Sequence, residues 1–188
     1  MLSDVRCVEH RGVDAAQQRD PPLGALVHEL ILALIPAGAG SFSGMTVSVQ
    51  STTTIEAGVP EIMAVLADVE SLVEWSDAHR AVEVREADDE GWPIVVWERL
   101  SQYGVTDEMV IRYEWYDGEV SWTLVESDSQ KLQNARYTLT DNGDGTTEVV
   151  FDLEVDLKIK LPGMVVRKAQ KHVADVATKG LRDEVLRR

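Results

Sequence analysis

Apolar and polar residues alternate along most of the chain after residue 45, and this alternation predicts a series of β-strands. The clearest case is the segment 146–158, in which Val149, Phe151, Leu153 and Val155 alternate with mostly acidic residues. The same pattern predicts strands at 46–56, 79–87, 92–102, 106–116, 119–127, 131–140 and 146–158. Gly-containing turns such as 141–145 separate several of them. Strands joined by tight turns are typical of an antiparallel sheet with one apolar and one solvated face.

A period of three to four residues predicts one long helix at 163–188 and two short helical segments at 60–68 and 69–75. Pro60 and Pro162 stand where helices begin, the position that tolerates proline. The apolar stripe of the long helix consists of Val166, Ala169, Val173, Val176, Ala177, Gly180 and Leu181. Such a stripe must lie against another apolar surface, and the apolar face of the sheet is the partner that the chain offers.

These elements predict an α+β, helix-grip fold for residues 45–188. A seven-stranded antiparallel sheet would curve around the long C-terminal helix, with two short helices after the first strand. Ala169, Ala177 and Gly180 are too small to fill the space between a helix and a curved sheet. We therefore expect a cavity between them, and such a cavity suggests an apolar guest.

Charge narrows the range of partners. The chain carries a formal charge of −15, so a nucleic-acid backbone is not an expected partner. Residues 45–162 contain 8 basic and 25 acidic side chains, whereas residues 163–188 contain 7 basic and 3 acidic ones. The basic face of the last helix could contact a membrane surface or another protein, or it could be only a solvated face. Cys7 is the single cysteine, so no intrachain disulfide can form, and a reducing, cytoplasmic location is expected.

Residues 1–44 read as an N-terminal extension without a clear period. Their apolar stretch, 23–39, is too short to span a bilayer. Three interpretations stay open: Met45 is the working start of the protein, the stretch is a short and loosely docked helix, or it belongs to a signal peptide. His28 and Glu29 interrupt the apolar run and argue against export. We expect this extension to be disordered or loosely docked.

The sequence offers no metal or cofactor motif. The four histidines, His10, His28, His79 and His172, are scattered and lie in no HExxH arrangement. Segment 141–145 fails as a calcium loop because glycines fall where oxygen ligands belong. No phosphate-binding glycine loop follows a strand. We expect neither a metal nor a cofactor.

A few polar residues share the inward face of the predicted strands. Glu98 has the parity of Val96 and Leu100, so it faces either the cavity or, if a bulge shifts the register, water. A buried carboxylate could serve as an acid or a base. Gln133 and Tyr137 share a face and could contact a guest, or could be ordinary core residues.

The tryptophans Trp75, Trp97, Trp115 and Trp122 offer flat apolar surface for a guest, although each could equally be a core residue. Asp77 and His79, two residues apart, could form a proton-transfer pair at the mouth of the cavity, or belong to a solvated loop.

Several short motifs, taken in order, resemble one family over residues 45–188. They are VLADVE at 65–70, EW at 74–75, YEW at 113–115, SWTL at 121–124, YTL at 137–139, VDL at 155–157 and LPG at 161–163. The chain resembles the START-like, helix-grip superfamily, and within it the polyketide cyclase/dehydrase and coenzyme-Q-binding-like branch. The resemblance implies a hydrophobic cavity between sheet and helix. Leu72–Val73 and residues 134–136 depart from the family pattern at places that border the cavity in the family.

We therefore expect a protein that binds, and could transport, a hydrophobic small molecule such as a lipid, a quinone or a polyketide. The alternative is a polyketide cyclase/dehydrase enzyme that uses the same cavity, with Glu98 and Tyr137 as candidates for acid–base steps. The expected ligand-binding residues are Trp75, Val96, Glu98, Met109, Ile111, Tyr113, Trp122, Gln133, Tyr137, Ala169, Val173 and Ala177.

Overall fold

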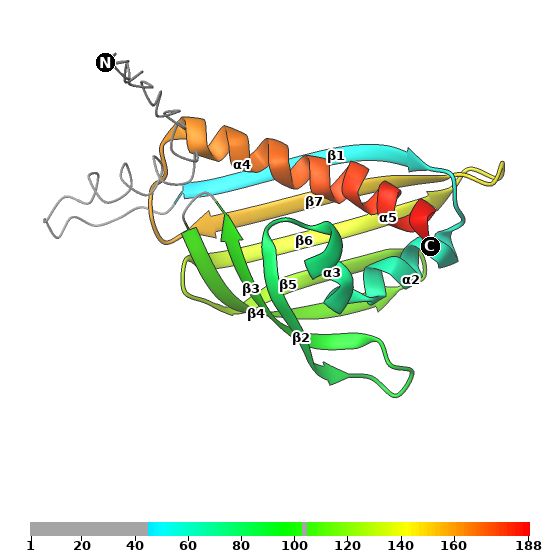
Figure 1. The fold of residues 1–188 in the computed structure, drawn as a ribbon, viewed down its shortest axis with the longest axis horizontal. Helices are drawn as coiled ribbons and strands as arrows, with labels where there is room; N and C mark the ends of the chain where they lie inside the picture. The colour runs from blue at the N-terminus through cyan, green and yellow to red at the C-terminus, as the bar shows by residue number, and fades with distance from the viewer. Residues whose placement is uncertain (1–44, 103–104) are drawn as a thin grey trace, which may run out of the picture.

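The structure is a computed structural model that describes residues 45–102 and 105–188. Within these ranges the chain forms one seven-stranded antiparallel sheet with the strand order β1-β7-β6-β5-β4-β3-β2 (Figure 1). The strands are β1 (Met45–Ile55), β2 (His79–Ala87), β3 (Pro93–Gln102), β4 (Val105–Tyr116), β5 (Glu119–Ser127), β6 (Gln130–Asp141) and β7 (Thr147–Leu157). The predicted helix-grip fold is confirmed. The expectations for residues 1–44 lie outside the described residues.

The turns between neighbouring strands follow the chemistry of their residues. Gly91, Gly118, Gly143 and Gly145 all have positive φ, which side-chain-bearing residues rarely adopt. At the β2–β3 turn, Asp88 Oδ1 accepts backbone hydrogen bonds from Glu90 and Trp92. The long excursion between β1 and β2 lets β1 pair with β7, so β1 and β2 form the two edges of the sheet.

Three short helical segments follow β1: α2 (Val59–Ala67), the 3₁₀-helix η1 (Val69–Ser71) and α3 (Leu72–Trp75). Pro60 lies in the first turn of α2, where its missing N–H costs nothing. Ile62, Met63 and Val65 turn inward from α2 and are buried. These segments therefore cover one end of the concave face of the sheet.

The C-terminal helix runs along β1 and β7 in three sections: α4 (Gly163–Asp175), the π-helical η2 (Val176–Gly180) and α5 (Leu181–Arg187) (Figure 1). A single α-helix was expected, and the π-helical section is a departure from it. Thr178 Oγ1 donates to the carbonyl of Ala174 at 2.6 Å, and such back-bonding competes with the regular helical pattern. A Cβ at Gly180 would lie 3.4 Å from the ring of Trp75, so the helix passes close to α3 here.

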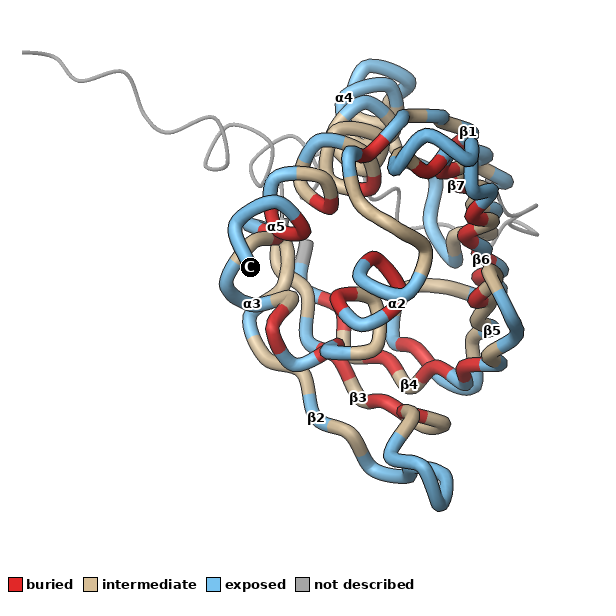
Figure 2. The backbone as a smooth tube through the Cα atoms, turned by 90° about the vertical axis from the view of Figure 1, so that its right-hand side faces the viewer, coloured by how far each residue is buried: buried red, intermediate tan, exposed pale blue. Residues whose placement is uncertain are grey.

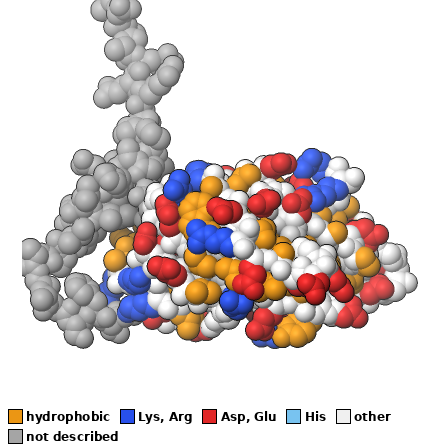
Figure 3. Space-filling model, turned by 90° about the horizontal axis from the view of Figure 1, so that it is seen from below, with side chains coloured by type: hydrophobic (Ala, Val, Ile, Leu, Met, Phe, Trp, Pro, Cys, Tyr) orange, Lys and Arg blue, Asp and Glu red, His pale blue; other side chains and the backbone are white. Residues whose placement is uncertain are grey.

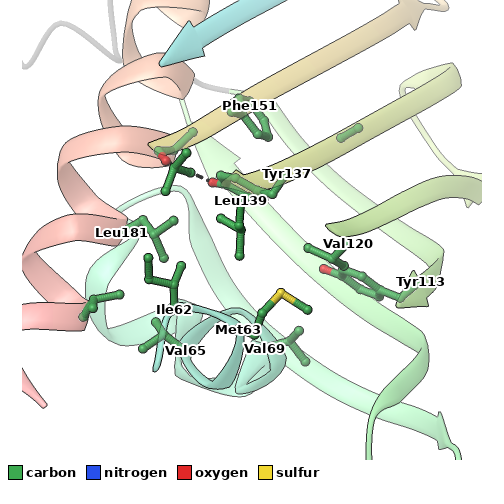
Figure 4. Packing of buried hydrophobic residues seen from close by; sticks show 14 of the residues in the cluster. Ile62, Met63, Val65, Val69, Tyr113, Val120, Tyr137, Leu139, Phe151 and Leu181 are labelled. Atoms are coloured by element: carbon green, nitrogen blue, oxygen red, sulfur yellow. Dashed lines mark hydrogen bonds between the residues drawn. The ribbon is translucent and has the colours of Figure 1, made fainter. Parts of the chain in front are cut away.

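The hydrophobic core lies at one end of the concave face, where α2 and α5 meet the sheet. We call this region the filled end and define it by Ile55, Ile62, Leu139, Val149 and Leu181, all of which are buried. Figure 4 shows Leu181 and Ile62 facing each other between the C-terminal helix and α2. Figure 2 shows that the buried stretches face the interior that the sheet, α2 and α5 enclose.

Charged groups fasten the last turn to the filled end. Glu184 is buried and accepts hydrogen bonds from Arg187 and Arg188. Arg188 also reaches Asp68 Oδ2 at 2.8 Å and Ser71 Oγ at 2.9 Å. The guanidinium of Arg187 beside it lowers the pKa of Glu184, so this carboxylate stays ionised.

Charged side chains of both signs are interspersed with hydrophobic ones over the lower face of the molecule (Figure 3). No helix in the described ranges is long and apolar enough to cross a membrane.

Candidate functional site

A cavity of about 370 Å³ lies between α4 and the concave face of the sheet. We call this region the hollow end and define it by Val47, Leu153, Val155, Val165 and Ala169, which line the cavity. All five are only half-buried, and none of the residues of α4, all of which the structure describes, is buried. The helix and the sheet therefore enclose apolar surface here without filling the space between them.

Small and branched side chains explain why this space stays open. On the helix side, Val165, Ala169 and Val173 face the cavity with at most three side-chain carbon atoms each. A side-chain hydrogen bond joins α4 to the edge strand, since Gln170 Nε2 donates to the carbonyl of Ser48 at 2.9 Å. A cavity lined by aliphatic side chains stays apolar and suits an apolar guest.

An aromatic cluster forms the wall of the cavity on the central strands. Trp122 lies between Tyr113 and Tyr137, with ring centroids 5.5 and 6.0 Å away. Tyr137 in turn contacts Phe151 at 4.7 Å. Such tilted ring pairs contribute beyond their buried area. The wall is therefore a connected aromatic surface against which a flat or elongated apolar molecule could lie.

One part of the cavity wall is polar. Glu98 on β3 points inward, and its side chain is only 3 % exposed. Its Oε2 lies 3.5 Å from His79 Nε2, at the start of β2. The other ring nitrogen of His79, Nδ1, lies 2.7 Å from Ser76 Oγ. Ser76, His79 and Glu98 thus form a polar chain along the cavity wall, and we call it the Glu98 cluster.

Both cavity tyrosines stay protonated near neutral pH. Burial, followed by the nearby Glu98 carboxylate, raises the pKa of Tyr113 well above its usual value. Burial also raises the pKa of Tyr137. The hydroxyl of Tyr137 donates to the carbonyl of Ala177 at 3.2 Å, shown as a dashed line in Figure 4. Tyr137 therefore has a structural bond to η2, whereas the Tyr113 hydroxyl lies beside the Glu98 cluster.

Asp107 also lines the cavity, but it has a structural role. Its carboxylate accepts hydrogen bonds from Ser127 Oγ, from the backbone of Asp128 and Ser129, and from Gln130 Nε2, at 2.9–3.1 Å. Such a network satisfies a buried carboxylate. It fixes the β5–β6 turn against β4.

The suggested pair of Asp77 and His79 is not the arrangement that the structure shows. Asp77 Oδ1 lies 2.9 Å from Nε2 of His172 on α4, while His79 turns to Ser76 and Glu98. The reason is geometric, because Asp77 is largely exposed at the loop after α3 and His79 has already entered β2. The His172–Asp77 contact joins α4 to the loop that follows α3.

The structure places ten of the twelve expected ligand-binding residues on the cavity wall: Trp75, Glu98, Met109, Tyr113, Trp122, Gln133, Tyr137, Ala169, Val173 and Ala177. Val96 and Ile111 do not line it. They oppose each other across β3 and β4 and are almost completely buried in the hydrophobic core. Alternation correctly gave their inward direction, but it does not say where along a strand the cavity ends.

Sequence reasoning missed six polar residues of the wall: Ser76, Asp107, Ser129, Gln130, Gln170 and His172. Asp107 shares the inward parity of Met109 and Ile111, so the signal was present in the pattern. His172 follows Ala169 by one helical step of three residues and could have been found in the same way. Ser76 lies in a turn and has no periodic signal. In the described ranges, no group of three or more His, Cys, Asp and Glu side chains is placed to hold a metal ion.

Comparison with known proteins identifies the family to which this chain belongs. The family model for polyketide cyclase / dehydrase and lipid transport matches residues 55–182, so the chain belongs to this family. No curated protein matches the sequence.

Solved structures show the same fold. The START superfamily protein from Mycobacterium smegmatis superimposes with a TM-score of 0.65 at 19% identity, covering 74% of this chain and 97% of that one. The Zhui aromatase/cyclase from Streptomyces sp. R1128 gives 0.63 at 17% identity, with 77% and 96% covered. A protein from Thermus thermophilus gives 0.62 at 21% identity, with 74% and 97% covered. At these identities the likeness supports the fold alone.

Proposed function

We propose that the protein binds a hydrophobic small molecule, such as a lipid, a quinone or a polyketide, in the cavity between α4 and the sheet, and that it could carry this molecule between sites. The observation that supports this proposal most is the cavity of about 370 Å³ at the hollow end, with walls of aliphatic and aromatic side chains. Removing roughly 250 Å² of a guest's apolar surface from water would contribute about 6 kcal/mol before the costs of association. Without those costs, 6 kcal/mol corresponds to a dissociation constant of about 40 μM, so burial of this surface alone supports weak binding.

Native mass spectrometry of protein purified from its own host tests this proposal. We expect a population carrying a bound apolar molecule, which organic extraction releases. Ala169→Leu should reduce that population because the added carbons enter the cavity, whereas Ala64→Leu, on the exposed side of α2, should not. A protein free of any adduct that also fails to bind a panel of apolar probes would contradict the proposal.

A second candidate function is a cyclase or dehydrase of polyketide chains. The observation that favours it is the Glu98 cluster, in which a buried carboxylate and an imidazole face an apolar cavity. Glu98 would take a proton from the carbon between two ketones, and His79 or Tyr113 would protonate a departing oxygen. The family and the aromatase/cyclase neighbour make this chemistry reasonable. Tyr137 is a weaker candidate because its hydroxyl is bonded to the Ala177 carbonyl.

Turnover of a poly-β-ketone analogue, followed by product analysis, distinguishes an enzyme from a carrier. Under the enzyme hypothesis, Glu98→Gln should remove most of the turnover while the fold survives. A wild-type protein without turnover, or an unchanged rate in the Glu98→Gln variant, would remove this hypothesis.

The basic start of α4 supports a contact with an anionic lipid surface. The segment 157–168 contains four basic residues and no acidic ones. Met164 is 64 % exposed, and Arg167 and Lys168, one helical step further on, are exposed on the same face of α4. An apolar tip flanked by cations is suited to the interface of an anionic bilayer. The expectation of a cytoplasmic location still rests on the single cysteine.

Co-sedimentation with vesicles tests this contact. Binding to phosphatidylglycerol vesicles should weaken from 50 to 500 mM salt and in the Lys168→Gln variant, whereas Arg112→Gln, on the outer face of β4, should have little effect. Equal binding to phosphatidylcholine vesicles would contradict an electrostatic contact.

A further inference from the structure

Apart from tyrosines, the ionisable side chains of the described residues that line the cavity are of two kinds, carboxylates and imidazoles. Two carboxylates, Glu98 and Asp107, lie on its wall together with two imidazoles, His79 and His172. Among the described residues that line the cavity there is no Lys or Arg. A guest that carries a negative charge would therefore meet carboxylates without a permanent cation to balance it.

Two of these four groups are engaged by residues outside the Glu98 cluster. Asp107 accepts hydrogen bonds from a hydroxyl, two backbone amides and the side-chain amide of Gln130. His172 Nε2 lies 2.9 Å from Asp77 Oδ1. Among these four ionisable groups, those of the Glu98 cluster therefore have the capacity to recognise a guest.

Glu98 retains the capacity to accept a further hydrogen bond. A carboxylate offers about four acceptor sites on its two oxygens. The 3.5 Å between Glu98 Oε2 and His79 Nε2 is longer than a good N–H···O hydrogen bond. Even with the Tyr113 hydroxyl nearby, the carboxylate can take a donor from the cavity side. Since a buried carboxylate is costly without hydrogen-bond donors, a donor supplied by the guest would be favourable.

We propose that the cavity selects a neutral apolar molecule that carries a hydroxyl group, an alcohol or a phenol, whose O–H donates to the carboxylate of Glu98. The apolar body of the guest then lies on the aromatic wall at Trp122, opposite Val165 and Ala169 on α4. A fatty acid is rejected, because its carboxylate would lie against that of Glu98. An ammonium would form an ion pair with Glu98, but it loses its hydration in a cavity with apolar walls, and we expect this cost to exceed the gain. This inference rests on the proposed binding function and specifies its ligand.

Four naphthalenes of similar size provide the test: 2-naphthol, 2-methylnaphthalene, 2-naphthoate and naphthalen-2-ylmethylammonium, each titrated calorimetrically at pH 7. We expect 2-naphthol to bind at least tenfold more tightly than 2-methylnaphthalene, and 2-naphthoate to bind most weakly. Glu98→Met replaces the carboxylate with an apolar side chain of similar length. In this variant the dissociation constants of 2-naphthol and 2-methylnaphthalene should differ by less than threefold. Glu126→Met, at an exposed position on β5, is the matched control and should keep the preference.

The outcomes separate this inference from the function on which it rests. If none of the four compounds binds, the proposed function fails and this inference fails with it. If they bind without preference for the hydroxyl, or if the carboxylate or the ammonium binds most tightly, the cavity binds apolar guests but the hydroxyl assignment is overturned. The order of affinities in the wild-type protein decides this even if Glu98→Met does not fold.

Discussion

The two ends of the concave face are built from the same kind of sequence and yet differ in how fully they are filled. Along β7, the inward residues Thr147, Val149 and Phe151 are buried, whereas Leu153 and Val155, with the same alternation, are half-buried. The C-terminal helix repeats the contrast, since α5 has buried residues and α4 has none. The filled end is covered by α2 and α5, whereas α4 covers the hollow end, where Val65, Val69 and Trp75 also line the cavity. The comparison teaches that alternation defines which face is apolar, while the size of the side chains that cover it decides whether that face is filled.

The largest expected difference between the two ends is in stability. Leu181→Ala removes a fully buried side chain at the filled end and should lower the free energy of unfolding by about 2–5 kcal/mol. Val165→Ala removes a half-buried side chain at the hollow end and should cost under about 1 kcal/mol. Urea unfolding measures both losses, provided that the m-values of the two variants equal that of the wild-type protein. Equal losses would mean that the hollow end is as tightly filled as the other.

Filling the hollow end should affect ligand binding more than stability. Ala169→Leu places three more carbon atoms in the cavity and should weaken the binding of 2-naphthol by at least tenfold. The free energy of unfolding should change by less than about 1 kcal/mol, because the added side chain enters open space. Calorimetric titration beside urea unfolding measures both quantities, with Ala64→Leu as the control. A large loss of stability in Ala169→Leu would indicate that the space is already occupied by side chains.

The bond between Tyr137 and η2, where the two ends meet, should make a smaller contribution. Tyr137→Phe removes the hydroxyl that donates to the Ala177 carbonyl but keeps the ring on Phe151. We expect a loss of about 0.5–1.5 kcal/mol of unfolding free energy. Tyr116→Phe is the matched control, because the Tyr116 hydroxyl is exposed and bonded only to Glu114. An equal effect of both changes would show that the bond to η2 is not stabilising.

The smallest expected effect is the pH dependence at the end of α4. Lys171 and Lys179 lower the pKa of Asp175 from 3.8 to about 2. Because the folded-state pKa is depressed, this contribution is fully present above the unfolded pKa and is lost as the pH falls from about 4 toward 2. At low salt, the melting temperature of Asp175→Asn should fall less between about pH 4 and pH 2 than that of the wild-type protein. Added salt should reduce this difference, since the ion pairs are exposed. Parallel curves of melting temperature against pH for the two proteins at low salt would contradict the stabilising role of these ion pairs.

The sequence was sufficient for the fold because alternation, turn glycines and the helical stripe all agree. It also gave the inward direction of Tyr137, whereas for Glu98 it left two directions open, the cavity and water. It could not give the partners of the polar residues, because His79 meets Glu98, and His172 meets Asp77, only through tertiary structure. Val96 and Ile111 show the same limit, since their parity fixes a face of the sheet but not the extent of the cavity. The π-helical section η2 depends on Thr178 and on the approach of Trp75 to Gly180, which a single helical period does not encode.

The most direct test of a guest at the hollow end is a crystal structure of the protein with 6-bromo-2-naphthol, located by the anomalous signal of bromine. We predict one strong peak inside the cavity, between the aromatic wall at Trp122 and α4 at Ala169, with the hydroxyl oxygen directed to Glu98. A peak elsewhere on the protein, or a cavity without a peak when the compound is present at saturating concentration, would contradict the account.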